Sequence, residues 1–126
     1  MRFLPTRVHG LIDYAWGILL MATPYAMSIP KGSAPMWIAW LFGAGAIAYS
    51  LATRYELGVL PILPMRLHLV LDGVAGAVLA GSPWLFGFAG MVSTVPFLIF
   101  GLFAVVASLI TRTEPIGPAL TERVRR

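Results

Sequence analysis

The sequence contains no cysteine among its 126 residues, and charged residues make up only 11% of the chain. The missing thiols exclude disulfides, thiolate metal sites and cysteine nucleophiles. The scarcity of charge, together with 59% apolar residues, excludes an ordinary soluble domain. The composition is therefore that of a membrane protein.

Four apolar stretches are separated by short connections, and they cover about residues 8–27, 35–52, 67–88 and 92–110. Each is close to the ~20 residues that a helix needs to cross a hydrocarbon core of ~30 Å. None shows the alternating polarity that is typical of barrel strands of about ten residues. We therefore predict an all-α membrane protein with four transmembrane helices.

Basic residues fall almost entirely on one side of the predicted spans. The N-terminus, the middle connection and the C-terminus carry all the arginines, whereas the other side carries only Lys31. Because positive charge is retained on the cytoplasmic side, both termini should be cytoplasmic. This distribution explains the net charge of +4 through membrane topology, so nucleic acid is not predicted as a partner.

A pattern of polar residues and prolines occurs twice in the chain. The first copy is Leu4-Pro5-x-Arg7-x-His9-x3-Asp13-x3-Gly17-x5-Thr23-Pro24-Tyr25, and the second is Leu63-Pro64-x-Arg66-x-His68-x3-Asp72-x3-Gly76-x5-Ser82-Pro83-Trp84. The second helix of each unit repeats too, since Gly43, Ala46, Ser50, Leu51, Thr53, Arg54 and Glu56 match Gly101, Ala104, Ser108, Leu109, Thr111, Arg112 and Glu114. Hydrophobic residues match easily by chance, but Arg, His, Asp and Pro in one fixed frame do not.

This repetition predicts two tandem two-helix units, residues 1–57 and 58–126, the second ending in a basic tail from about residue 113. Each unit crosses the membrane twice, so both copies have the same orientation. The units should be related by a pseudo-two-fold axis along the membrane normal, which makes them parallel and not inverted repeats.

The repeated histidine and aspartate form the candidate site, which consists of His9, Asp13, His68 and Asp72. A spacing of four places each pair on one helical stripe. A carboxylate at the centre of a transmembrane helix costs about 2.5–3.5 kcal/mol, so each aspartate should face protein. The histidine or the arginine one turn away is the obvious partner.

Three interpretations of these four residues remain open. The first is a buried polar clamp, in which each aspartate is hydrogen-bonded to histidine or to a neighbouring helix and Gly17 and Gly76 allow close approach of helix backbones. The second is a path for protons or a small solute. The third is binding of haem, with the two histidines as axial ligands, or of quinone. No catalytic constellation stands out, and we predict neither an enzyme nor a metal site.

The remaining repeated residues have anchoring explanations. Pro24 and Pro83 each remove a backbone hydrogen bond to the carbonyl four residues earlier, and the hydroxyls of Thr23 and Ser82 should compensate. Two further pairs are predicted to lie at the membrane boundaries, Arg7 and Arg66 as cytoplasmic anchors and Tyr25 and Trp84 in the outer aromatic belt.

Ser82-Pro83-Trp84, following His68-x3-Asp72-x3-Gly76 on one predicted helix, resembles the SPW repeat family of small bacterial membrane proteins. That family is named for a Ser-Pro-Trp motif in the first of two transmembrane helices. The first half departs from the motif, with Thr23-Pro24-Tyr25 in its place. The resemblance implies a bacterial inner membrane protein and supplies a fold, but it implies no reaction or ligand.

We therefore expect a non-enzymatic structural or accessory subunit. A chain of 13.6 kDa with little mass outside the bilayer has scant surface for soluble substrates. Its partners should be the lipid bilayer and either further copies of itself or a larger membrane complex, contacted through helix faces. The alternative is a ligand-handling membrane protein that uses the His-Asp pairs.

Overall fold

The computed structural model describes residues 1–126 as five α-helices and no β-strand. The helices are α1 (Thr6–Ala26), α2 (Ala34–Leu51), α3 (Met65–Leu85), α4 (Thr94–Ile110) and α5 (Leu120–Val124). The first four agree with the predicted spans to within a few residues. Helices α2 and α3 are long and apolar enough to cross a membrane, while α4 is apolar but shorter, at 17 residues.

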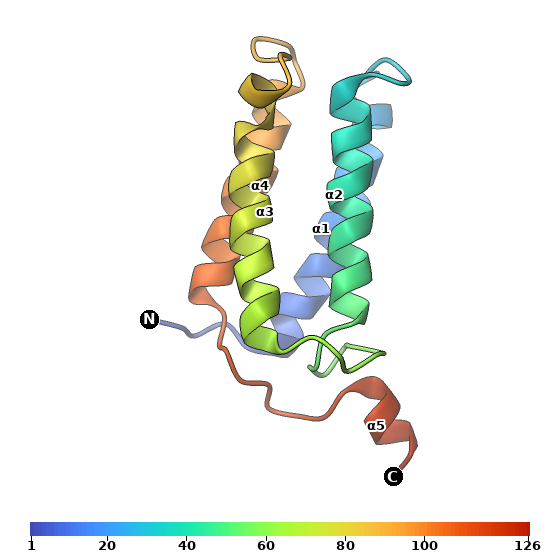
Figure 1. Ribbon diagram of the computed structural model, residues 1–126, viewed down its shortest axis with the longest axis vertical. Helices are drawn as coiled ribbons and strands as arrows, with labels where there is room; N and C mark the ends of the chain where they lie inside the picture. The colour runs from blue at the N-terminus through green and yellow to red at the C-terminus, as the bar shows by residue number, and fades with distance from the viewer.

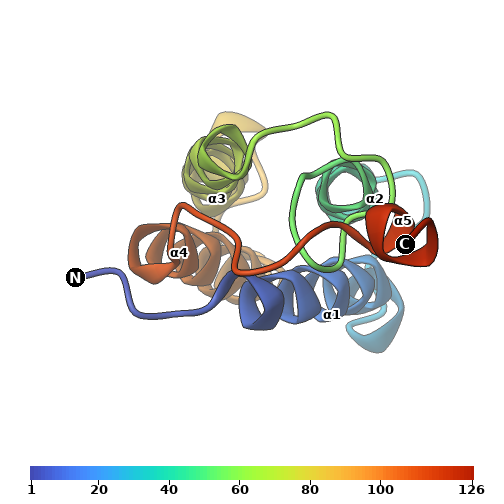
Figure 2. The same ribbon diagram turned by 90° about the horizontal axis from the view of Figure 1, so that it is seen from below.

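The four long helices form two hairpins that stand side by side (Figure 1). Helix α1 packs mainly on α2, and α3 packs mainly on α4, with sparser contacts between the hairpins. Seen along the helices, the four occupy the corners of a quadrilateral (Figure 2). The N-terminus, the middle connection and the C-terminal tail all lie at one end, and the two short hairpin loops lie at the other.

Proline determines where the first helix of each hairpin begins. Pro5 and Pro64 occupy the N-cap positions in an extended conformation, with φ of −64° and −63°. Each therefore lies one residue before the first helical residue, Thr6 or Met65. Proline fits this position because its φ is restricted near −65° and because it has no N–H that needs a partner.

The two internal prolines are compensated differently. The Ser82 hydroxyl donates to the Leu79 carbonyl at 2.7 Å, which is the acceptor that Pro83 leaves without its usual partner. The Thr23 hydroxyl donates instead to the Leu19 carbonyl, one residue before the acceptor that Pro24 frees. The predicted compensation is therefore confirmed for Ser82 and wrong for Thr23.

Glycines allow the two helices of each hairpin to cross at close range, as predicted. A Cβ atom built on Gly43 would lie 2.6 Å from the Gly17 carbonyl oxygen, and one built on Gly76 would lie 2.6 Å from the Gly101 carbonyl oxygen. A side chain larger than hydrogen would force these backbones apart. Small residues provide such crossings in membrane helices, where packing contributes more to association than hydrophobic burial does.

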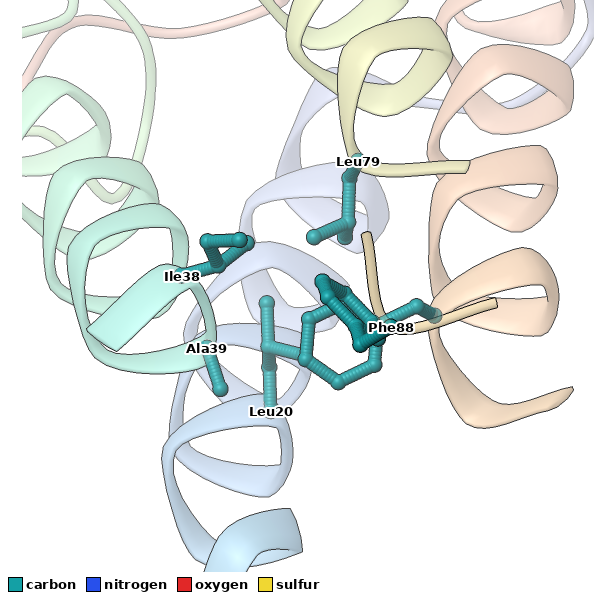
Figure 3. Close-up of a cluster of buried hydrophobic side chains, with 6 residues drawn as sticks. Leu20, Ile38, Ala39, Leu79 and Phe88 are labelled. Atoms are coloured by element: carbon teal, nitrogen blue, oxygen red, sulfur yellow. The ribbon is translucent and has the colours of Figure 1, made fainter. Parts of the chain in front are cut away.

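An apolar cluster fills the half of the bundle nearest the hairpin loops. Leu20, Ile38, Ala39, Leu79, Phe88 and Phe97 are all buried. Figure 3 shows the side chains of this cluster converging from the four helices and from the loop after α3. The polar side chains that make contacts between the two hairpins lie in the opposite half of the bundle, near the chain termini.

The C-terminal tail runs across the middle connection and is held there by Glu56. One carboxylate oxygen of Glu56 accepts from the backbone N–H groups of Ile116 and Gly117, and the other accepts from the Thr6 hydroxyl at 2.7 Å. Burial raises the pKa of Glu56, but these hydrogen bonds lower it by more, so the pKa lies below its ordinary value. The tail was predicted only as a basic extension.

Candidate functional site

The four predicted site residues come together in one buried ring, defined here as His9, Asp13, His68 and Asp72. His9 Nε2 lies 2.8 Å from Asp72 Oδ2 and 3.3 Å from Asp13 Oδ2. His68 Nε2 lies 2.9 Å from Asp13 Oδ2 and 3.2 Å from Asp72 Oδ2. The two nitrogen and two oxygen atoms therefore alternate around a closed ring of four non-covalent contacts. The side chains that form it are at most 11% exposed.

The shorter contact of each histidine is to the opposite hairpin. The sequence predicted for each aspartate a partner one turn away or on a neighbouring helix, and the two contacts within one helix are the longer ones. His9 extends from α1 toward α3, and His68 extends from α3 toward α1. Because the main-chain contacts between hairpins are sparse, the ring is a principal polar connection between them.

One threonine contacts Nδ1, the other ring nitrogen, of each histidine. Thr111 Oγ1 lies 2.8 Å from His9 Nδ1, and Thr53 Oγ1 lies 2.8 Å from His68 Nδ1. Each threonine stands at the end of the second helix of the opposite hairpin. Both Nδ1 and Nε2 of each histidine are therefore bound by the hairpin to which that histidine does not belong.

Counting hydrogens determines the tautomer of both histidines. The Thr53 hydroxyl donates to the Tyr49 carbonyl at 2.6 Å, and the Thr111 hydroxyl donates to the Ala107 carbonyl at 2.6 Å. A hydroxyl has one proton, so each threonine oxygen accepts from the histidine Nδ1–H. Nε2 is then the nitrogen that faces the carboxylates, where it carries either a second proton or a lone pair.

The surroundings of the ring are less symmetric than the ring itself. Asp72 Oδ1 accepts from the Tyr49 hydroxyl, whereas Asp13 Oδ2 accepts from Ser50 at 3.2 Å. The residue that matches Tyr49 in the second repeat is Ala107. Ala107 is one of the residues that line a cavity of about 10 Å³ beside His9.

This cavity limits what the site holds in the present conformation. About 10 Å³ accommodates a single water-sized species. Organic cofactors generally occupy sites of about 300–1,000 Å³. The two imidazoles are also in edge contact with each other, with ring centroids 5.4 Å apart, so no macrocycle fits between them. The geometry gives no support to the haem and quinone interpretations.

Besides Tyr49, the contacts of the ring that sequence reasoning did not single out are Thr53 and Thr111. They were visible as a matched pair in the second helix of each repeat. Threonine near the end of an apolar helix has an ordinary explanation, because its hydroxyl can bond to its own helix. Their fixed position in a repeat that also contains histidine was the available signal.

The other repeated residues lie outside the ring. Tyr25 and Trp84 are exposed near the loop end of the bundle, at 57% and 60%. Arg7 is exposed at the opposite end, and Arg66 there forms an exposed ion pair with Glu114 at 3.3 Å. Their roles as membrane anchors remain predictions.

Comparison with known proteins gives a family and no closer relative. No curated protein and no solved structure matches the chain at the significance applied. The family model described as the SPW repeat domain matches residues 7–111, which include both hairpins and all four residues of the ring. The resemblance that the Ser-Pro-Trp triplet indicated is thus confirmed, and the chain belongs to the SPW repeat family.

Proposed function

We propose that this protein is a non-enzymatic, four-span subunit of the bacterial inner membrane, built from a duplicated hairpin. In this proposal it has a structural or accessory role in a larger assembly. The ring carries the proposal, because its polar atoms are engaged in joining the two hairpins. A closed polar cluster of this kind stabilises one arrangement of helices and offers no unbonded group to a substrate.

The faces of the helices support an assembly role. Large apolar side chains are exposed along each of the four long helices, as Leu19, Leu41, Val74 and Leu102 illustrate. Lipid tails pack against such apolar faces, and helices of another subunit can pack there in the same way. The chain outside the four long helices consists of the N-terminal residues, three connections and the C-terminal tail with α5 (Figure 1).

A transmembrane proton path is less well supported. The ring lies within the first two turns of α1 and α3, and beyond it the bundle is filled by the buried apolar cluster that contains Leu20, Leu79 and Phe97. Protons move through membranes along chains of polar groups or water. The apolar cluster interrupts such a chain halfway across the bundle.

Native mass spectrometry in a mild detergent tests the assembly role. We expect either a homo-oligomer of defined number or a complex with a reproducible second subunit. Substitution of outward-facing leucines, such as Leu41→Ala or Leu102→Ala, should weaken the complex without loss of helicity. A well-folded monomer with no reproducible partner would remove the basis of the proposal.

The absence of cysteine makes the proposed topology directly testable. A single cysteine at Lys31, in the loop after α1, should react with an impermeant maleimide added outside intact spheroplasts. A cysteine at Arg125, in the tail, should react only after the membrane is opened. Both positions are exposed, so burial does not account for a difference. Equal labelling of the two would contradict a cytoplasmic C-terminus.

A further inference from the structure

We propose that the ring of His9, Asp13, His68 and Asp72 is a structural binding site for one divalent transition-metal cation of the zinc class. This inference goes beyond the accessory role, because it assigns a ligand to the ring. It rests on the ring's dimensions, the direction of its lone pairs, its charge and its burial. Each of these observations is independent of the family match.

The dimensions of the ring match those of a metal coordination shell. Four donor atoms at about 2.0–2.1 Å from zinc are separated from their neighbours by about 3.3 Å in a tetrahedron, and by about 2.9 Å in a square. The four nitrogen to oxygen distances around the ring are 2.8, 2.9, 3.2 and 3.3 Å. All four donor atoms lie within 4.8 Å of one another. A cation therefore enters with shifts of a few tenths of an ångström.

The tautomer of each histidine leaves Nε2 as the nitrogen that faces the carboxylate oxygens of the ring. Each Nδ1–H is engaged by Thr53 or Thr111, so each Nε2 directs its lone pair at the carboxylate oxygens when it carries no second proton. Without a cation, a proton makes each of these short contacts a hydrogen bond, and a bound cation takes the place of that proton. A second group bound to the distal imidazole nitrogen is the usual arrangement around metal-ligating histidines.

Charge favours a divalent ion in particular. When both aspartates are ionised, they carry two negative charges in a region with almost no exposure to water, where an uncompensated charge is costly. One divalent cation with two neutral imidazoles and two carboxylates makes the site neutral. Imidazole donors favour zinc and its transition-metal neighbours over magnesium and calcium, which prefer oxygen donors.

Such a site is structural because it is closed. Four protein ligands complete a tetrahedral zinc site, and two of them come from each hairpin. The cation would add a direct link between α1 and α3, which pack mainly on α2 and α4. The small cavity next to Ala107 leaves space for at most one water-sized group beside the metal.

Metal content and cobalt spectroscopy test this assignment on the full chain. The protein is purified in mild detergent on a tag without histidine, and its metals are measured by elemental mass spectrometry. We expect about one zinc-class ion per chain. After chelation, titration with Co²⁺ should produce the visible d–d bands of a four-coordinate site with nitrogen and oxygen donors. Wild-type protein that is helical by circular dichroism but binds neither metal overturns the proposal.

Variants locate the site. His68→Gln and Asp72→Asn should lose the cobalt bands, whereas Thr53→Val should weaken Co²⁺ binding by about 10–100-fold through the histidine it orients. Ser108→Ala is the matched control, because Ser108 occupies the position equivalent to Ser50 but bonds to its own helix at Val105. Cobalt bands that persist in the folded His68→Gln and Asp72→Asn variants place the metal elsewhere and overturn the proposal. If neither variant folds, the wild-type and Thr53→Val measurements decide it.

Discussion

The strongest test of the ring as a connection between hairpins is a double-mutant cycle on His9 and Asp72. Asp72→Asn keeps the shape of the side chain but removes its charge. The wild-type carboxylate faces His9 Nε2 at 2.8 Å and His68 Nε2 at 3.2 Å, and it also accepts from the Tyr49 hydroxyl. The variant leaves two histidines with one carboxylate. His9→Gln and the double variant complete the cycle.

The expected magnitude depends on whether the pair is ionic. A neutral hydrogen bond between membrane helices contributes about 0.6 kcal/mol on average and at most about 1.7 kcal/mol. Removal of one partner from a buried ion pair costs about 3–5 kcal/mol, because the other charge is left without compensation. The side chains of His9 and Asp72 are only 1% and 7% exposed, so the partner that remains in each single variant is buried without its counterpart. We expect each single variant to lose about 3–5 kcal/mol.

The double variant should lose less than the sum of the single variants, with a coupling of about 1–3 kcal/mol. Reversible unfolding in mixed detergent, followed by circular dichroism, measures the free energies. A chelator is present throughout, so that no bound cation contributes. The control cycle is Arg66→Gln with Glu114→Gln. That pair has a similar separation of 3.3 Å but is 73% and 80% exposed, so its coupling should be at most about 1 kcal/mol. A coupling in the ring no larger than in this control would refute the argument.

Three further predictions concern packing, the tail and the metal. Gly76→Ala should destabilise the protein by about 1–3 kcal/mol because its Cβ meets the backbone of α4. Gly81→Ala in the same helix, where no atom lies closer than 3.8 Å to the added Cβ, should be neutral or slightly stabilising. Equal melting temperatures of the two variants would contradict the close crossing. The lowered pKa of Glu56 means that its carboxylate stabilises the tail above the ordinary pKa of 4.5 and that this contribution is lost as the pH falls below it. The protection factors for amide exchange at Ile116 and Gly117, which are corrected for the intrinsic pH dependence of exchange, should therefore fall in acid and, in Glu56→Gln, at neutral pH as well. Removing the proposed metal with a chelator should lower the melting temperature, and the Asp72→Asn variant should show no such shift. A free metal concentration of 100 times Kd corresponds to a stabilisation of about 2.7 kcal/mol, which the chelator removes.

The helices could be predicted almost completely from the sequence. Runs of apolar residues bounded by proline and glycine specify both length and ends, because a chain in lipid must satisfy its backbone hydrogen bonds internally. The close crossings at Gly17 and Gly76 followed from the small residues on both helices. The docking of the tail on Glu56 did not, since it depends on three backbone and hydroxyl donors brought together from distant segments.

The residues of the site were predictable, but their pairing was not. A spacing of four indicated a contact between His9 and Asp13 within one helix, and that contact exists at 3.3 Å. The shorter contact, to Asp72, depends on how the hairpins face each other. Nothing in the local pattern distinguishes a His-Asp pair within one helix from a pair formed between the two hairpins. The proposed metal site was not predicted, because each pair alone offers only two ligands.

The sequence by itself determined the helices, the repeated frame and the identity of the four polar residues. Burial of a carboxylate in an apolar chain is costly, so its presence twice in the same frame already required a partner. Only the tertiary structure decided which partner. The packing of the two hairpins places each histidine between the aspartate and the threonine of the opposite hairpin, and this turns two separate His-Asp pairs into one closed ring with four converging donor atoms.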